Sequence, residues 1–323
     1  MGTLVNGTFF IPALNGSIID IDNCTNSICS PEWAQLHYIP SLPGNVIYLA
    51  IFSMLLVAHV ALGIRYRTWG FLAGLVTGLL LEMAGYIARL ELHFDDFSFI
   101  YFVISLCCLA LAPALISASI YLCISRLATV CGPGVARFPP SFYTGFFIGC
   151  DCISIALQAA GGAIAATAAG GSTLQNTGVD LMLGGISFQV VSLFCCLILS
   201  FDLALCADRT RRRTTLEGHR DRSGHDARNL IGYFSFTIIA ATLFIFVRCC
   251  FRVAELKGGF SGPVANNQGL FMALEGPMVM LAVIVLAVSH PGRCFGGHLG
   301  WQAANWTWKN QQARREMETK GDL

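Results

Sequence analysis

The stretch WGFLAGLVTGLLLEMAGYIARL, residues 69–90, decides the fold class, because it is long and apolar enough to cross a bilayer as a helix. Its polar residues Glu82, Tyr86 and Arg89 recur at spacings of four and three, so they share one helical face. An ionised side chain in hydrocarbon costs at least about 2.5 kcal/mol on insertion scales. We therefore expect this face to point away from lipid, towards partners on other helices.

Further apolar segments of similar length predict a polytopic membrane protein of the all-α class, with seven transmembrane helices. The composition agrees, since 12% of the residues are charged, against roughly 25% in soluble domains. In the last segment Pro277 follows Glu275 and is expected to loosen the helix. The predicted helices cover residues 45–64, 69–90, 101–125, 143–166, 180–206, 230–252 and 267–289.

The first 43 residues form a polar tail with the signature of an extracellular or lumenal segment. N-glycosylation sequons occur at Asn6, Asn15 and Asn23. Cys24 and Cys29 lie in the same tail, and we expect them to form a disulfide in an oxidising compartment. The alternative is that both remain free thiols.

The distribution of basic residues gives the same orientation. With the amino terminus outside, all but four of the 20 Lys and Arg residues fall in the cytosolic loops and the carboxyl-terminal tail. The four exceptions are Arg89, Arg248, Arg252 and Lys257. The carboxyl terminus is therefore expected in the cytosol.

Three regions follow from these assignments. Residues 1–43 form the outer tail, residues 44–291 form the transmembrane domain, and residues 292–323 form a cytosolic tail. Trp301 and Trp308 in that tail recur at helical spacing and predict a short interfacial helix. The longest connection, residues 207–229, is expected to be a solvated cytosolic loop.

Further polar residues occur inside the predicted membrane helices. Intramembrane ionisable residues mark functional sites by default, although charge pairs also serve structure. The two interpretations are a buried ion-pair network that fixes helix packing and a polar pocket open to the outer leaflet. Gly70, Gly74 and Gly78, which precede Glu82, instead predict close packing of a neighbouring helix. For ligand binding the candidates are Glu82, Tyr86, Arg89, Asp151, Gln158, Gln189, Arg248, Arg252, Glu255 and Glu275.

Motifs of common enzyme classes do not occur in the sequence. It contains no Walker-type phosphate loop, no His-Glu-x-x-His pair, no Gly-x-Ser-x-Gly elbow and no paired CxxC motif. We therefore predict no catalytic residue, no metal site and no cofactor, and nothing supports nucleic-acid binding.

A set of polar and small residues recurs through the seven predicted helices: Glu82, Gly85, Tyr86, Arg89, Ala112, Pro113, Tyr121, Asp151, Ser154, Gln158, Gly161, Gly185, Gln189, Arg248, Arg252, Glu255, Glu275, His290 and Pro291. In their order and spacing over about residues 38–291, these residues resemble those of the fungal lipid-translocating exporter family, the RTA-like proteins. The resemblance implies a protein of the plasma membrane, or of endomembranes. It links the chain to resistance toward toxic sterol analogues, release of sphingoid long-chain bases, or porphyrin and haem traffic.

The expected function is transport of an amphipathic, lipid-like molecule. A sphingoid base would place its cationic head against Glu82 or Glu275 and its tail among the helices, in contact with membrane lipids. A porphyrin or haem ligand would instead bring carboxylates to Arg89, Arg248 or Arg252. A receptor or sensor that signals through residues 207–229 is the other alternative. The oligomeric state is left open.

Overall fold

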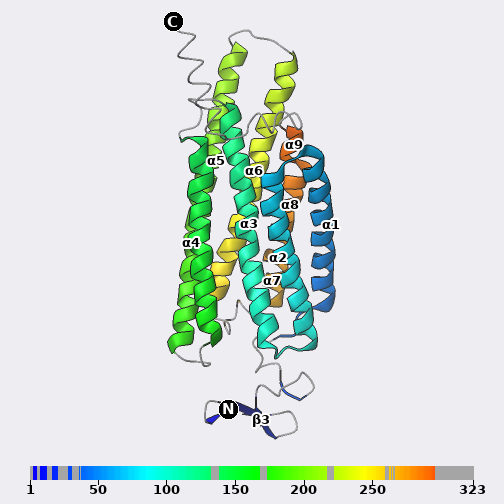
Figure 1. The fold of residues 1–323 in the computed structure, drawn as a ribbon, viewed down its shortest axis with the longest axis vertical. Coiled ribbons are helices and arrows are strands. Elements are labelled where there is room, and N and C mark those ends of the chain that lie inside the picture. Colours follow the sequence, from blue (N-terminus) through cyan, green and yellow to red (C-terminus); the bar gives the residue numbers. More distant parts are fainter. Residues whose placement is uncertain are drawn as a thin grey trace.

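The computed structural model describes residues 3–5, 8–12, 17–20, 28–30, 36, 38–131, 138–167, 173–216, 222–258, 262, 264 and 266–294. Seven spans in this part of the chain are long and apolar enough to cross a membrane, which confirms the predicted number. They form the upright bundle of Figure 1. The helices are α1 (Leu42–Tyr66), α2 (Trp69–Phe94), α3 (Phe99–Cys131), α4 (Pro140–Thr167), α5 (Thr173–Leu216), α6 (Arg222–Lys257), α7 (Gln268–Leu274), α8 (Gly276–Val288) and the short α9 (Pro291–Cys294).

The seventh span is two helices rather than one. α7 ends at Leu274, α8 begins at Gly276, and Glu275 lies between them. Pro277 occupies the first turn of α8, where its missing amide hydrogen is tolerated. The predicted loosening at this point is confirmed.

The predicted solvated loop over residues 207–229 is wrong in most of its length. α5 continues to Leu216 and α6 begins at Arg222, so both helices extend beyond the apolar segments. Figure 1 shows them projecting past the rest of the bundle. The apolar pattern marks only the part of a helix that lies in lipid, whereas the adjoining Arg, Leu and Ala residues favour helix in water as well.

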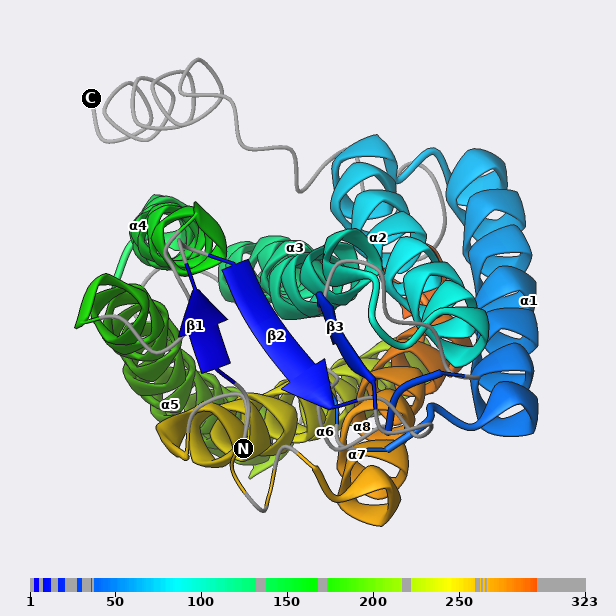
Figure 2. The ribbon, with the colours of Figure 1, turned by 90° about the horizontal axis from the view of Figure 1, so that it is seen from below.

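The amino-terminal tail contains a small sheet that the sequence analysis did not predict. β1 (Thr3–Val5), β2 (Thr8–Pro12) and β3 (Ile18–Asp20) pair as antiparallel neighbours in that order. Figure 2 shows the sheet across one end of the bundle, which we call the sheet end; the opposite end is the far end. The all-α class is confirmed for the membrane domain, and the sheet adds to it.

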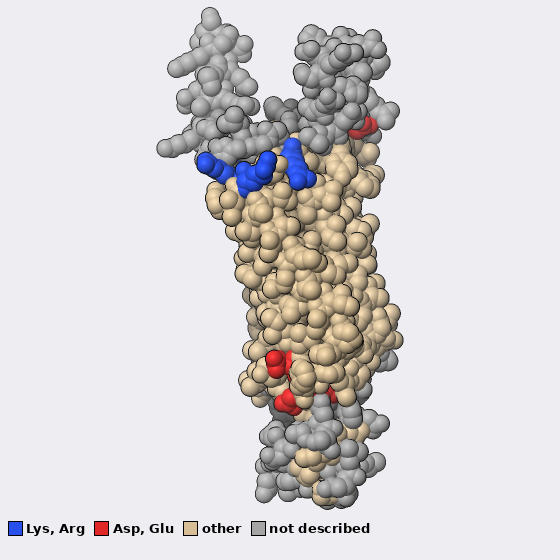
Figure 3. All heavy atoms as spheres, turned by 90° about the vertical axis from the view of Figure 1, so that its right-hand side faces the viewer, with Lys and Arg blue, Asp and Glu red and all other residues tan. Residues whose placement is uncertain are grey.

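Exposed charged residues gather at the two ends of the bundle. On the face drawn in Figure 3, Lys and Arg lie at the far end, where acidic atoms also show, and further Asp and Glu lie at the sheet end, with an uncharged band between the two ends. Large apolar side chains are exposed on the membrane spans, among them Met54 and Val57 of α1. This protein is therefore a multi-pass membrane protein, and the band is the surface that lipid covers.

Small residues bring neighbouring helices together. α2 packs along α3, and a Cβ atom added at Gly74 would lie 2.5 Å from Ser119 Oγ. α4 packs along α5, where a Cβ atom at Gly178 would lie 2.5 Å from the amide nitrogen of Ala165. The predicted close packing is confirmed at Gly74 and Gly78. At Gly70 an added Cβ atom would lie 3.6 Å from Leu122 Cδ1, an ordinary contact distance, so the close approach does not extend to this position.

Candidate functional site

The polar face of α2 points into the bundle. Glu82 is 1% exposed, Tyr86 is 0% exposed and Arg89 is 5% exposed. The spacing of four and three thus places all three side chains among other helices, as predicted.

Arg248 of α6 reaches across to two partners. It donates one hydrogen bond to the backbone carbonyl oxygen of Leu109 in α3. It also forms an ion pair with Glu275, with 2.5 Å between Arg248 Nη2 and Glu275 Oε1. Pro113 lies four residues after Leu109 and has no amide hydrogen, so it leaves the Leu109 oxygen without its usual helical donor. Arg248 therefore satisfies an acceptor that a proline exposes.

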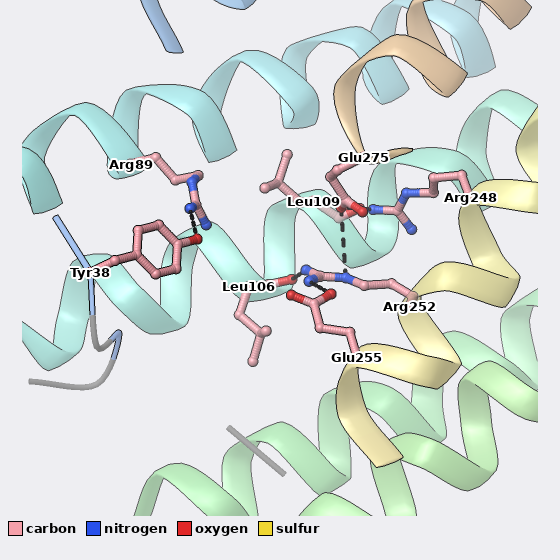
Figure 4. Close-up of polar contacts among 8 residues, drawn as sticks. All are labelled: Tyr38, Arg89, Leu106, Leu109, Arg248, Arg252, Glu255 and Glu275. Atoms are coloured by element: carbon pink, nitrogen blue, oxygen red, sulfur yellow. Dashed lines mark hydrogen bonds and ion pairs between the residues drawn. The ribbon is translucent and has the colours of Figure 1, made fainter. Parts of the chain in front are cut away.

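Arg252 lies one turn along α6 and forms a second pair. Its Nη1 atom lies 2.5 Å from Glu255 Oε2, and its Nε atom lies 3.6 Å from Glu275 Oε1. Arg252 also donates a 3.4 Å hydrogen bond to the carbonyl oxygen of Leu106. Glu275 thus joins both arginines, as Figure 4 shows. We call Arg248, Arg252, Glu255 and Glu275 the charge network.

The break between α7 and α8 allows the close approach of α1 and α2. The Tyr48 hydroxyl of α1 donates a 2.5 Å hydrogen bond to the carbonyl oxygen of Met272, next to the break. A Cβ atom at Gly276 would lie 2.7 Å from the Tyr86 hydroxyl oxygen and 3.0 Å from the Tyr48 ring. The Tyr86 ring also stacks on Phe52, with 5.6 Å between the ring centroids. Glycine at position 276 therefore lets Tyr86 lie directly against the break.

Glu82 lies beside the charge network without joining it. The electrostatic neighbours of its carboxylate include Arg248, Arg252 and Glu275. Neither carboxylate oxygen of Glu82 has a hydrogen-bond partner among the described residues, and the same holds for the Tyr86 hydroxyl. These groups are buried polar atoms without partners, which are rare in native structures and call for an explanation.

Arg89 points to a different set of groups at the sheet end. Its Nη2 atom donates a 2.7 Å hydrogen bond to the Tyr38 hydroxyl. Its guanidinium carbon lies 3.8 Å from the centroid of the Phe271 ring, at the distance of a cation–π contact. Arg89 thus ties the segment before α1 to α2 and α7. In Figure 4 it lies apart from the charge network.

Asp151 of α4 pairs with α3. Ser117 Oγ donates a 2.9 Å hydrogen bond to Asp151 Oδ2. The other oxygen, Asp151 Oδ1, has no hydrogen-bond partner within the part of the chain that the structure describes. Tyr121 also lies beside Asp151.

The two buried glutamines bind each other across α4 and α5. Gln158 Nε2 donates a 3.2 Å hydrogen bond to Gln189 Oε1 and a 2.8 Å hydrogen bond to Ser154 Oγ. Ser154 in turn donates a 2.7 Å hydrogen bond to the carbonyl oxygen of Gly185. This arrangement fixes α4 against α5, at the point where Gly185 allows the two helices to approach.

The ten predicted residues therefore fall into three groups. Glu82, Tyr86 and the charge network lie together between α2, α3, α6 and the α7–α8 break. Asp151, Gln158 and Gln189 form contacts between α4 and its neighbours. Arg89 forms the third group by itself, because its contacts with Tyr38 and Phe271 lie at the sheet end. We take the first group as the candidate site.

A histidine pair at the far end was missed by the sequence analysis. His59 of α1 and His290 are both buried, with 6.3 Å between their ring centroids. His59 Nε2 lies 3.2 Å from the carbonyl oxygen of Val283, and His290 Nδ1 accepts a 3.2 Å hydrogen bond from the Gly292 amide. Each residue reads as an isolated histidine in the sequence, so no pattern indicates the pair. Among the described residues, no group of three or more His, Cys, Asp or Glu side chains is arranged to hold a metal ion.

At the sheet end, Asp96 follows α2 and is buried. Burial, reinforced by the neighbouring Asp95 charge and opposed by Arg89, raises the pKa of the Asp96 carboxyl to about 7. Its charge therefore changes near neutral pH.

Several predictions about the two tails fall outside the described residues. Cys29 is disulfide-bonded, but Cys24, its predicted partner, lies outside those residues. The sequons at Asn6, Asn15 and Asn23 lie outside them as well, and so does the predicted interfacial helix at residues 301–308. These assignments remain predictions.

Comparison with known proteins gives a family match and several yeast relatives. The sequence model of the RTA1-like proteins matches residues 75–298. The sphingoid long-chain base transporter RSB1 of Saccharomyces cerevisiae is 28% identical over 282 residues, which cover 80% of this chain and 74% of the relative. Protoporphyrin uptake protein 1 of the same species is 28% identical over 221 residues, or 68% of this chain and 67% of the relative.

A third yeast relative, protein RTM1, is 26% identical over 247 residues, which cover 74% of this chain and 75% of the relative. No solved structure matches the chain.

Proposed function

Because the chain belongs to the RTA1-like protein family, we propose that it transports an amphipathic, lipid-like molecule and that Glu82 receives the cationic head group of this cargo. The family match covers α2 from residue 75 onward, and it includes every member of the charge network. The names of the relatives supply the class of cargo. One is a sphingoid long-chain base transporter and another is a protoporphyrin uptake protein.

The proposal rests on the burial of the Glu82 carboxylate and on its lack of hydrogen-bond partners among the described residues. Glu82 is 1% exposed, and both of its carboxylate oxygens lack a hydrogen-bond partner among the described residues. A buried carboxylate without a partner is unfavourable, so this position suits a cationic ligand that supplies the missing donors. The amine of a sphingoid base is such a ligand. The Tyr86 hydroxyl one turn away, which has no hydrogen-bond partner in the described part of the chain, can accept or donate a further hydrogen bond.

A porphyrin is the second candidate cargo, and the protoporphyrin uptake relative is the reason to consider it. Its carboxylates would need guanidinium groups. Arg248 and Arg252 already pair with Glu275 and Glu255, and Arg89 donates to Tyr38. Porphyrin binding would have to displace these contacts, whereas a cationic head group at Glu82 displaces none of those described. The site therefore favours the cationic cargo.

The test is transport by the full-length protein in liposomes of neutral lipid. A sphingoid base with a fluorophore on its tail is added outside, and a membrane-impermeant quencher reports how much has crossed. We expect the wild-type protein to accelerate crossing over protein-free liposomes, and Glu82→Gln to remove most of the acceleration. Glu91→Gln is the matched control, because Glu91 lies on the same helix but is exposed.

Other outcomes would redirect or refute the proposal. Wild-type liposomes that move the sphingoid base no faster than empty ones would refute transport. A visible porphyrin absorbance band in the purified protein, lost on Arg248→Leu and kept in Glu82→Gln, would replace the cationic cargo by a porphyrin. Binding without crossing would favour a receptor or sensor. The plasma membrane is the proposed location, and fluorescence microscopy of the tagged protein checks it.

A further inference from the structure

Buried carboxylates outnumber buried guanidinium groups at the candidate site. The carboxylates are Glu82, Glu255 and Glu275, and the guanidinium groups are Arg248 and Arg252. The two arginines are engaged by Glu275, by Glu255 and by the carbonyl oxygens of α3. If every group is ionised, Glu82 therefore contributes one negative charge that these arginines do not balance.

Arg89 does not serve as the missing counter-charge. It lies seven residues from Glu82 on α2, which corresponds to about 10 Å along the helix axis. Its guanidinium donates to Tyr38 and lies against the Phe271 ring. These contacts hold the Arg89 guanidinium at the sheet end and not beside Glu82.

The groups that face Glu82 come from each of the surrounding elements. α6 contributes Arg248 and Arg252, and the break between α7 and α8 contributes Glu275. On α3 the thiol of Cys108 lies near the Glu82 carboxylate, and on α2 itself the Tyr86 hydroxyl does. Tyr48 of α1 packs on the Tyr86 ring, with 5.4 Å between the centroids. In this set the arginines are the only cations, and both are already paired.

An unbalanced carboxylate in the membrane interior requires a cation, and two cations fit this position. The cargo head group is one, and a proton is the other. Both neutralise the same single charge, so they exclude each other.

We propose that Glu82 binds a proton and the cationic cargo in alternation, and that the protein exchanges one proton for each cargo molecule. This inference rests on the proposed function, because it assigns an energy source to the same site. In the exchange, the Glu82 carboxylate gains a proton from water as the head group leaves. On the other side of the membrane it releases the proton as a new head group arrives. One positive charge moves in each direction, so the cycle is electroneutral.

The experiment uses N,N,N-trimethylsphingosine, whose positive charge is independent of pH. An ordinary sphingoid base would carry protons by itself, since its amine titrates and its neutral form crosses lipid unaided. The full-length protein is reconstituted in liposomes that enclose a pH-sensitive dye. We expect entry of the trimethyl compound to be matched by exit of about one proton per molecule. A pH gradient should drive the exchange, and a potassium diffusion potential should leave its rate unchanged.

Binding to the detergent-solubilised protein gives an independent measurement. For the wild type, the affinity for the trimethyl compound should fall by up to about tenfold per pH unit on the acid side of the Glu82 titration. In Glu82→Gln the affinity should be low and independent of pH. Glu82→Asp keeps a carboxylate and should keep the pH dependence, and Glu91→Gln should behave as the wild type. The thermal unfolding temperature of each variant verifies that it is folded.

Each outcome bears on one of the two proposals. Crossing of the trimethyl compound without proton movement, or a pH dependence that persists in Glu82→Gln, would overturn the exchange and leave transport standing. A trimethyl compound that neither binds to nor crosses with the wild-type protein, while a primary-amine sphingoid base still crosses, would overturn the exchange, because a positive charge alone would then not displace the proton. If neither compound crosses faster than in empty liposomes, the proposed function is overturned, and the exchange with it. The wild-type measurements alone distinguish these cases, even if Glu82→Gln does not fold.

Discussion

Pro113 and Arg248 are complementary across the interface between α3 and α6. Pro113 has no amide hydrogen to donate to the carbonyl oxygen of Leu109, and Arg248 donates to that oxygen instead. The same guanidinium pairs with Glu275 at the break in the last span. Two interruptions of regular helix are thus joined by one buried side chain, as in transporters that build sites from interrupted helices.

Arg248→Leu should destabilise the protein, because it leaves the Leu109 carbonyl oxygen without a donor and removes the shorter of the two arginine contacts of Glu275, whose contact with Arg252 is 3.6 Å. Loss of one partner of a buried ion pair costs about 3–5 kcal/mol. We expect a smaller loss in a Pro113→Ala background, where the new amide can bond to Leu109. A double-mutant cycle on unfolding in detergent measures the difference.

Arg252→Leu is the control for this cycle. Arg252 donates to Leu106, whose helical donor is the amide of Ala110 and does not depend on Pro113. Pro113→Ala should therefore leave the cost of Arg252→Leu unchanged. Additive costs of Arg248→Leu and Pro113→Ala would contradict the complementarity.

Gly276→Ala should destabilise the break between α7 and α8. The added methyl group would lie 2.7 Å from the Tyr86 hydroxyl oxygen, so the tyrosine must move. Overpacking of this kind costs about 1–3 kcal/mol. Tyr86→Phe removes the closest atom and should recover part of the loss. If Tyr86→Phe makes Gly276→Ala no less costly in the thermal unfolding temperature, the contact is not the cause.

The two helices α4 and α5 offer a matched pair of glycines. Gly178→Ala should destabilise the protein, because the new Cβ atom would lie 2.5 Å from the backbone nitrogen of Ala165. At Gly149 the same change meets nothing within 4 Å, and alanine is favoured in a helix by roughly 0.5–1 kcal/mol. Gly149→Ala should therefore be neutral or stabilising. Equal shifts in unfolding temperature for the two variants would rule out helix–helix distance as the determinant.

Asp96 should make stability depend on pH near neutrality. Its pKa is about 7 in the folded protein, against about 4 when unfolded, so the folded state binds more protons between these values. Stability therefore falls as the pH rises from about 4 to about 7, and the full loss is present above that range. Asp96→Asn should match the wild type near pH 4 and unfold at a higher temperature at pH 8. A difference between the two proteins that stays constant from pH 4 to pH 8 would contradict this assignment.

Part of the candidate site could be predicted from the sequence. The spacing of Glu82, Tyr86 and Arg89 placed them on one inward face, and the cost of a charge in lipid fixed which way that face points. The positions of Arg248, Arg252 and Glu275 indicated charges inside the membrane, and a buried ion-pair network was one of the two interpretations. Which arginine pairs with which glutamate was not predictable, because side chains far apart in the chain meet only when the helices pack.

By itself, the sequence determined the seven spans, the break near Pro277 and the inward direction of the α2 face, because membrane insertion and helix geometry are local properties of a segment. Tertiary structure alone decided that Gln158 and Gln189 bind each other and that His59 meets His290. It also decided that Arg248 reaches the carbonyl oxygen exposed by Pro113, and that the Glu82 carboxylate has no hydrogen-bond partner among the described residues. These outcomes depend on distances between helices, which the packing of small residues sets and no single segment encodes.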